Sequence, residues 1–107
     1  MRVTDAISST GLLTATLRWT PPRNAVTITL RYASALIAKN SWTSASLFAD
    51  ALPGNTNLIT VTIPYVDGIV FFALKSQNVD GAWSELSNNA FWPSQKQYLP
   101  LTAKRYE

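Results

Sequence analysis

Apolar and polar side chains alternate along several short segments of this chain, and no other feature of the sequence constrains the fold as strongly. In the first of these segments, Ala15, Leu17 and Trp19 are separated by polar residues. Neighbouring side chains of a β-strand point to opposite faces, so this pattern predicts strands with one buried and one exposed face. The alternating segments are residues 15–19, 27–32, 59–63 and 70–75. No long stretch has the periodicity of a helix, and the sequence therefore predicts an all-β fold.

Turn residues separate these segments at intervals of roughly 8–12 residues, which is the rhythm of antiparallel sandwiches. Pro21-Pro22 ends the first segment, Pro53-Gly54-Asn55 precedes the third, and Asp80-Gly81 marks a hairpin-type turn. Glycine tolerates positive φ and aspartate can bond its own backbone. We expect residues 90–92 to close the sheet. Residues 33–52 lack strict alternation, so a short helical turn and an irregular edge strand are both compatible with them.

The length of 107 residues predicts one domain with one hydrophobic core. We assign residues 1–92 to this domain. Residues 93–107 contain two prolines and carry a net positive charge, which predicts a linker or extended tail. Packing along an edge strand, docking on a neighbouring domain and free disorder are all compatible with that tail. No apolar run approaches the roughly 18 residues of a membrane-spanning helix, so no membrane span is expected.

Four segments stand in an informative order and spacing. Residues 17–22 read Leu-Arg-Trp-Thr-Pro-Pro, and residues 30–33 read Leu-Arg-Tyr-Ala. Residues 70–75 read Val-Phe-Phe-Ala-Leu-Lys, and residues 84–88 have the pattern Ser-x-x-Ser-Asn. In this order they are similar to the second, third and sixth strands, and to the run before the last strand, of a fibronectin type III domain. The resemblance covers residues 3–92 and is closest to bacterial members appended to secreted enzymes and surface proteins.

The resemblance implies an immunoglobulin-like antiparallel β-sandwich of about seven strands, with the two chain ends at opposite ends of the body. Trp19, Tyr32 and Phe72 lie on apolar faces of the expected strands, where aromatic side chains fill a core. The implied function is a non-catalytic structural spacer or protein-interaction module of a larger extracellular or cell-envelope protein. Its partners are then the neighbouring domains of that protein, and the isolated domain is expected to be a monomer. Val70 is a departure, because family members usually carry a tyrosine there, while Tyr65 has a different offset.

Three further tryptophans, Trp42, Trp83 and Trp92, fall in or beside the expected loops. Exposed aromatic rings form platforms on which sugars stack, and Asp80 and Glu85 near Trp83 are suited to accept hydrogen bonds from sugar hydroxyls. This pattern makes a carbohydrate-binding module, with a polysaccharide as partner, the alternative function. In the competing interpretation, the same tryptophans close the open ends of the sandwich and contact no ligand.

The composition argues against catalysis, cofactors and nucleic acid. The chain has no histidine and no cysteine, which removes the commonest general base, disulfides and thiolate metal sites. Asp67 and Asp80 fit turns, Lys75 lies on the polar face of its strand, and residues 78–81 offer only two side chains to calcium. The net charge is +3, but residues 1–92 hold six cations and five anions dispersed along the chain. We therefore expect no enzyme activity, no cofactor, no metal and no nucleic-acid partner.

Overall fold

The computed structural model describes residues 1–93, and its regular elements in this range are strands and one short helix. The strands are β1 (Arg2–Ser9), β2 (Leu12–Arg18), β3 (Thr27–Ala33), β4 (Ser46–Pro53), β5 (Leu58–Pro64), β6 (Val70–Gln77) and β7 (Ala90–Trp92). A 3₁₀ helix, η1 (Trp42–Ser44), precedes β4. The prediction of an all-β fold is therefore confirmed. Of the expected tail 93–107, residues 94–107 lie outside the described part of the chain.

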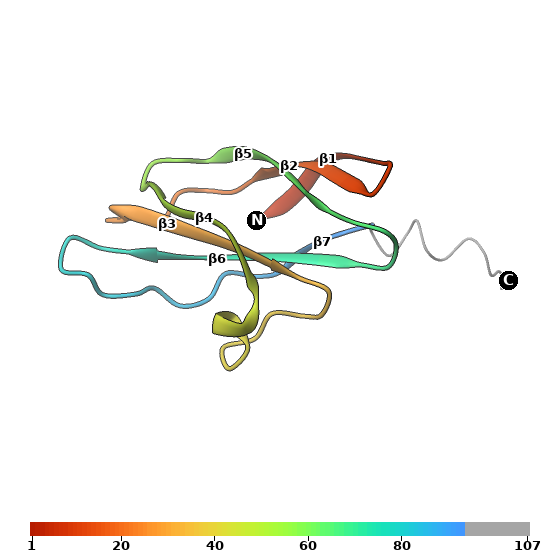
Figure 1. Cartoon of the computed structure of the whole chain (residues 1–107). Helices are drawn as coiled ribbons and strands as arrows, with labels where there is room; N and C mark the ends of the chain where they lie inside the picture. Colours follow the sequence, from red (N-terminus) through yellow and green to blue (C-terminus); the bar gives the residue numbers. More distant parts are fainter. Residues whose placement is uncertain (94–107) are drawn as a thin grey trace, which may run out of the picture.

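The seven strands form two antiparallel sheets that pack as a sandwich. One sheet has the strand order β1-β2-β5, and the other has the order β4-β3-β6-β7. Figure 1 shows the layer of β1, β2 and β5 above the layer that contains β3, β6 and β7. β2 and β5 are distant in the sequence, as are β3 and β6, so both sheets depend on long-range pairing.

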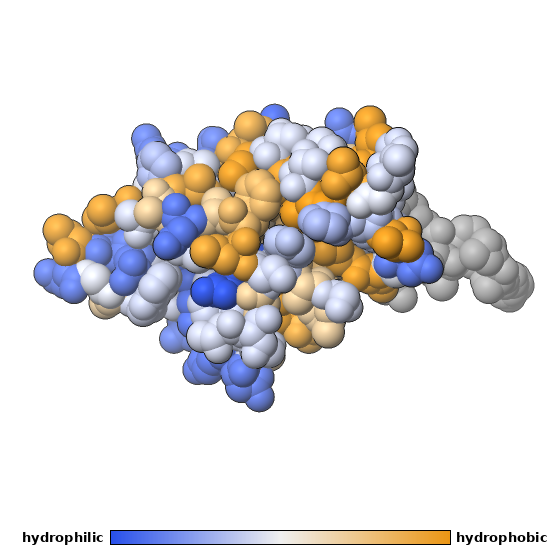
Figure 2. Space-filling view, in the orientation of Figure 1, coloured by the Kyte–Doolittle hydropathy of each residue, from blue (hydrophilic) through white to orange (hydrophobic). Residues whose placement is uncertain are grey.

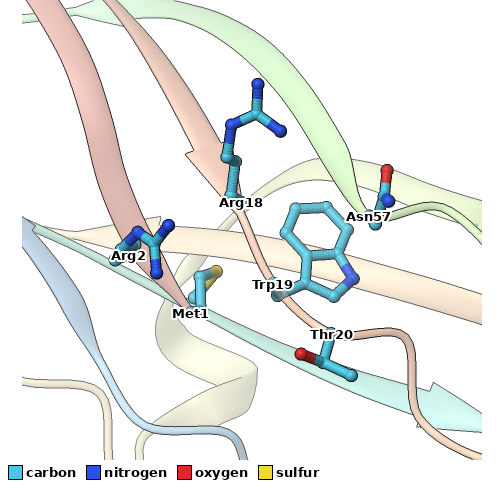
Figure 3. Close-up of a pocket in the computed structure, with 6 residues that line it drawn as sticks. All are labelled: Met1, Arg2, Arg18, Trp19, Thr20 and Asn57. Atoms are coloured by element: carbon cyan, nitrogen blue, oxygen red, sulfur yellow. The ribbon is translucent and has the colours of Figure 1, made fainter.

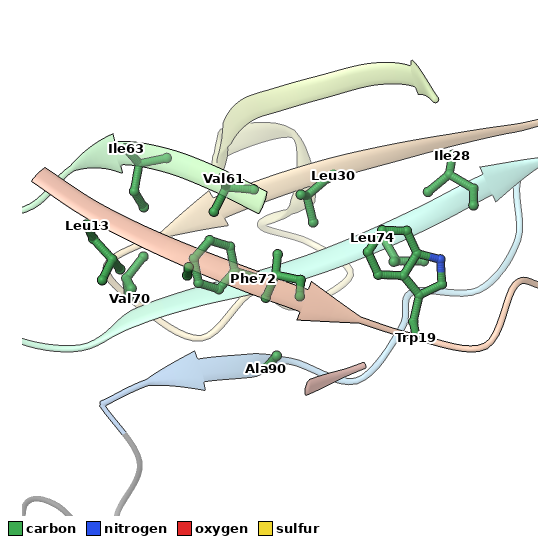
Figure 4. Close-up of a cluster of buried hydrophobic side chains, with 12 residues drawn as sticks. Leu13, Trp19, Ile28, Leu30, Val61, Ile63, Val70, Phe72, Leu74 and Ala90 are labelled. Carbon is green, nitrogen blue, oxygen red and sulfur yellow. The ribbon is translucent and has the colours of Figure 1, made fainter. Parts of the chain in front are cut away.

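Side chains from the inner faces of both sheets form one hydrophobic core (Figure 4). Its largest fully buried members are Leu13, Leu17, Ile28, Leu30, Val61, Ile63 and Phe72. Of the three aromatic residues expected there, Phe72 is completely buried, Trp19 is 9% exposed, and Tyr32 is half-buried and packs against the cluster. Burial of one large apolar side chain contributes roughly 1.5–3 kcal/mol, so this cluster is the main source of stability of the fold.

The expected turn at Asp80-Gly81 follows β6. Gly81 has a φ of 83°, a left-handed conformation that glycine adopts without steric cost. Its amide donates a hydrogen bond to the carbonyl oxygen of Asn78 at 2.9 Å. Oδ1 of Asn78 in turn accepts hydrogen bonds from the amides of Asp80 and Ala82, at 2.9 and 3.0 Å. The turn therefore lies where the sequence predicts it, but the side chain that bonds its backbone is the preceding asparagine, which reaches both amides.

The segment without strict alternation, residues 33–52, contains both structures that the sequence allows. η1 forms within it, and β4 follows as an edge strand of the four-stranded sheet. The pairing of β4 with β3 has two register shifts, and Ala51 has a φ of 59°. These irregularities explain why no strict alternation is visible in the sequence, because each shift changes which face the next side chain occupies.

The corner before β6 is bridged by Tyr65. Its hydroxyl donates a hydrogen bond to the carbonyl oxygen of Gly68 at 2.8 Å. Gly68 has a φ of 88°, which lets the chain turn sharply there. Val70, at the position where the resemblance would place a tyrosine, is instead buried in the core. A tyrosine hydroxyl thus bonds the backbone of this corner, but from a different position.

The described chain starts beside the segment that leads into β7, since the Met1 ammonium donates a hydrogen bond to Oδ1 of Asn88 at 2.8 Å and β1 contacts β7. β1 begins at Arg2, which lies opposite Arg18, the last residue of β2 and the neighbour of Trp19. β7 ends at Trp92, which lies opposite Val70, the first residue of β6. Figure 4 shows Trp19 and Val70 toward opposite ends of the core. The first strand therefore starts at the Trp19 end, and the last strand finishes at the Val70 end.

Candidate functional site

A second hydrophobic cluster lies on the outer face of the four-stranded sheet. It consists of Ile37, Trp42, Ala45 and Ala73, and we call it the outer cluster. Ala73 belongs to β6, whereas the other three come from the connection between β3 and β4, which extends beyond the sheet in Figure 1. Asn89 fastens this connection, because its Oδ1 accepts from the Ile37 amide at 2.8 Å and its Nδ2 donates to the Ile37 carbonyl oxygen at 2.9 Å. The outer cluster therefore holds η1 against the sheet.

Two cations lie over the ring of Trp42. The guanidinium carbon of Arg31 is 5.2 Å from the ring centroid, and the ammonium nitrogen of Lys75 is 5.4 Å from it. Nη1 of Arg31 also donates a hydrogen bond to the carbonyl oxygen of Ala45 at 2.8 Å. A cation over an indole ring contributes about 0.5–2 kcal/mol. Trp42 therefore helps to hold both charges at the outer surface of β3 and β6.

The two cations line a hollow of about 390 Å³, which we call the outer-face hollow. Its lining residues are Thr29, Arg31, Trp42, Thr43, Leu47, Asp50, Lys75 and Trp83. Trp83 follows β6, where an isolated bridge pairs it with Gln77, and it is 52% exposed. Oδ1 of Asp50 accepts a hydrogen bond from the Thr29 hydroxyl at 3.1 Å. The outer-face hollow thus combines an exposed indole, two cations and one carboxylate that already accepts a hydrogen bond from a hydroxyl.

The three tryptophans expected at a ligand site lie in different environments. Trp83 and Trp42 both line the outer-face hollow, but Trp42 is only 6% exposed and mainly packs in the outer cluster. Trp92 is elsewhere, edge-to-face against Tyr65, with the ring centroids 5.5 Å apart. Of the three, Trp83 is therefore the one that offers a large aromatic surface at a hollow.

The two carboxylates expected beside the exposed tryptophan do not line the outer-face hollow. Asp80 is exposed in the turn after β6, and Glu85 lines a separate hollow at the other side of the segment that leads to β7. The charged residues that the outer-face hollow contains are Arg31, Lys75 and Asp50. The outer-face hollow therefore has an excess of positive charge, whereas the sequence predicted carboxylate hydrogen-bond acceptors beside the exposed tryptophan.

Sequence reasoning missed the gathering of Arg31, Lys75 and Asp50. Alternation assigns the two cations to the polar faces of their strands, and the register places Thr29 opposite Lys75. A period of two identifies the face of a strand but not the strand that will lie beside it. Asp50 lies in β4, whose register shifts remove the alternation. The pairing of β3 with β6 was the missing information.

A separate hollow of about 340 Å³ lies at the Trp19 end of the sandwich (Figure 3). Its lining residues are Met1, Arg2, Arg18, Trp19, Thr20 and Asn57. The Trp19 amide donates to the carbonyl oxygen of Asn57 at 3.1 Å, while Nε1 of Trp19 is buried without a hydrogen-bond partner in residues 1–93. Figure 3 shows the Arg18 guanidinium directed away from the indole. The cations of this hollow do not converge on one position, so it is the weaker candidate.

Within residues 1–93, no three of the His, Cys, Asp and Glu residues lie together so that they could hold a metal ion. In the same range, no helix has both the length and the hydrophobicity to cross a membrane. On the face shown in Figure 2, hydrophobic residues lie among hydrophilic and intermediate ones.

Comparisons with protein-family models, with curated proteins and with solved structures find no match to this chain.

Proposed function

We propose that this chain is a non-catalytic structural spacer or protein-interaction module of the fibronectin type III kind, within a longer extracellular or cell-envelope protein. The observation that carries the proposal is the path of the chain, since β1 starts at the Trp19 end and β7 finishes at the Val70 end. The chain thus enters and leaves the body at different positions, and the paired strands between them hold the domains before and after it at a fixed separation. The proposed partners are therefore neighbouring domains, and the isolated module is proposed to be a monomer.

The positions of the motif residues support the family. Trp19 directly follows β2 and packs in the core, and Tyr32 lies in β3. Ser84 and Ser87 of the Ser-x-x-Ser-Asn run bond the backbone of β6. The strand order is a further argument, because β4 pairs with β3, whereas the fourth strand of a constant-type immunoglobulin domain lies in the sheet of the fifth.

Spin labels near the entry and the exit of the described chain test the spacer function. The chain has no cysteine, so Arg2→Cys with Phe91→Cys introduces two unique labelling positions, both exposed. We expect one narrow distance distribution, because both residues lie in hydrogen-bonded strands. Leu12→Cys with Leu58→Cys, at exposed positions near opposite ends of the paired strands β2 and β5, is the control that measures the width contributed by the labels. A distribution much broader than that of the control would contradict a spacer of fixed length.

The compartment and the lack of catalysis have separate tests. We expect the coding sequence to place a secretion signal upstream and another domain beside this one. A reading frame with neither would contradict the proposed extracellular or envelope setting. A hydrolase screen of the purified chain is expected to be negative, and an activity that disappeared in Lys75→Ala or Asp80→Ala would contradict the non-catalytic assignment.

A second candidate function, carbohydrate binding, is favoured by one specific observation. Trp83 is half exposed at a hollow that it shares with polar and charged side chains. Binding sites for small ligands combine aromatic walls with a few polar groups that fix orientation. We propose polysaccharide binding at the outer-face hollow as an additional role of the module, compatible with a spacer because the hollow lies on a sheet face and not at either end.

A further inference from the structure

The cations of the outer-face hollow have no carboxylate partner in the described part of the chain. The Lys75 ammonium lies over an indole and makes no hydrogen bond or ion pair within residues 1–93. Arg31 donates to the carbonyl oxygen of Ala45, which is an uncharged acceptor. Asp50, the one carboxylate that lines the hollow, accepts a threonine hydroxyl. The hollow therefore has an excess of positive charge, two cations against the one carboxylate of Asp50, and this excess attracts anionic ligands.

A flat apolar wall stands beside these charges. Trp83 lines the hollow and is 52% exposed to solvent, and aromatic faces of this kind pack against the apolar faces of ring-shaped ligands. The hydroxyl of Thr43, which also lines the hollow, makes no hydrogen bond within residues 1–93. The volume of about 390 Å³ is within the range of roughly 300–1,000 Å³ that small-ligand sites occupy.

We propose that the outer-face hollow binds a uronate unit of an acidic polysaccharide. The sugar ring stacks on Trp83, and its carboxylate accepts hydrogen bonds from Nζ of Lys75 and from Nη2 of Arg31, because Nη1 of Arg31 already donates to Ala45 and its Nε is buried. The inference rests on polysaccharide binding, the second candidate function, and specifies the class of sugar.

The donors of the hollow favour an acidic sugar over a neutral one. A neutral sugar offers hydroxyls, which cannot balance the excess positive charge of Lys75 and Arg31 over Asp50. A uronate supplies that anion and the ring on one rigid unit. An acidic peptide also supplies carboxylates, but without a ring that matches the indole face of Trp83. The combination of cations with an exposed indole therefore points to the uronate.

Calorimetric titration of the full chain tests the proposal. The probes are oligogalacturonate, a neutral galactose oligomer of the same length, and polyglutamate. We expect oligogalacturonate to bind at least about tenfold more tightly than either of the others, and to bind more weakly as salt is added, because exposed charges are screened. Trp83→Ala and Lys75→Gln are each expected to weaken the binding of oligogalacturonate by about tenfold.

Two matched variants separate the hollow from the rest of the surface. Lys39→Gln removes the same charge from an exposed position in the connection between β3 and β4, and Phe91→Ala removes an exposed aromatic ring from β7. Both are expected to leave the affinity for oligogalacturonate unchanged. Far-ultraviolet circular dichroism of each variant checks that the sandwich has formed.

Each other outcome overturns the inference. Equal binding of the neutral oligomer through Trp83 would retain carbohydrate binding but reject the acidic sugar. Equal or tighter binding of polyglutamate would identify the hollow as a site for acidic peptides. Equal losses in Lys75→Gln and Lys39→Gln would show a general effect of net charge, and no binding at all would reject both the inference and the second candidate function. None of these results changes the label distances that test the spacer.

Discussion

The backbone amide of Leu74 donates a hydrogen bond to the hydroxyl oxygen of Ser87 at 2.9 Å, and the Ser87 amide donates to the carbonyl oxygen of Leu74 at 3.0 Å. Ser76 and Ser84 are joined in the same way, at 2.9 and 2.8 Å. Each serine hydroxyl thus takes the place of a strand carbonyl opposite β6. The two serines complete the hydrogen bonds of β6 where the segment before β7 is not a strand, which gives the Ser-x-x-Ser spacing a structural role.

Replacement of Ser87 by alanine is expected to destabilise the fold. The Leu74 amide, part of a buried residue, would lose its hydrogen-bond partner, and an unsatisfied buried group costs about 1–3 kcal/mol. Urea unfolding of Ser87→Ala should show a lower midpoint with an unchanged slope. Ser34→Ala, at an exposed serine in the loop after β3, is the control. Equal midpoints in the two variants would show that water replaces the hydroxyl without loss.

Gly54 is expected to tolerate alanine less well than Gly11. A Cβ on Gly54 would overlap the carbonyl group of Ala25 and lie 2.9 Å from the amide nitrogen of Val26, so the backbone must move. A Cβ on Gly11 meets nothing within 4 Å, but the φ of 81° there costs an alanine about 1–2 kcal/mol. The midpoint temperature of thermal unfolding should therefore be lower for Gly54→Ala than for Gly11→Ala. The reverse order would mean that the Pro53-Gly54 turn relaxes freely.

Alternation made the strands around the core predictable because burial of one face is a local property of each strand. Leu13, Leu17, Ile28 and Phe72 are all completely buried, and each lies on the apolar face of a segment with alternating or largely apolar side chains. The turn residues between the segments then defined where strands end. The fold class therefore followed from the sequence without knowledge of which strands pair.

The outer cluster was not predictable in this way. Trp42 is buried by contact with Ala73, which is distant in the sequence, and under Arg31 and Lys75 from two strands. Nothing in the local pattern around Trp42 distinguishes it from an exposed loop tryptophan such as Trp83. The candidate site depends on the same long-range pairing, so of the residues that line it only the two tryptophans, Trp42 and Trp83, were candidates from the sequence.

β1 shows how one irregular position changes the buried face. Strict alternation would place Val3 and Ile7 on the same face, but the pairing of β1 with β2 shifts between Val3 and Asp5. As a result Ala6 packs against the core, while Ile7 is 68% exposed. A bulge adds a residue on one strand and thereby reverses the orientation of the residues after it.

This difference predicts unequal effects of the same substitution. Ile28→Val removes a methylene group from a fully buried side chain and is expected to lower the free energy of unfolding by about 0.5–1.5 kcal/mol. Ile7→Val removes the same group from an exposed side chain and is expected to change it by less than about 0.5 kcal/mol. Urea titrations of both variants provide the measurement. A loss in Ile7→Val as large as that in Ile28→Val would place Ile7 in the core and contradict the register of β1.

Acrylamide quenching distinguishes the tryptophans by their exposure. The chain has four tryptophans, and Trp83 is the most exposed of them, whereas Trp19 and Trp42 are buried. Trp83→Phe should therefore remove most of the fluorescence that acrylamide reaches. Trp42→Phe removes a shielded emitter, so the accessible fraction of the remaining fluorescence should rise. If Trp83→Phe left that fraction unchanged, the indole would be shielded in solution, and a sugar ring would have no aromatic surface on which to stack.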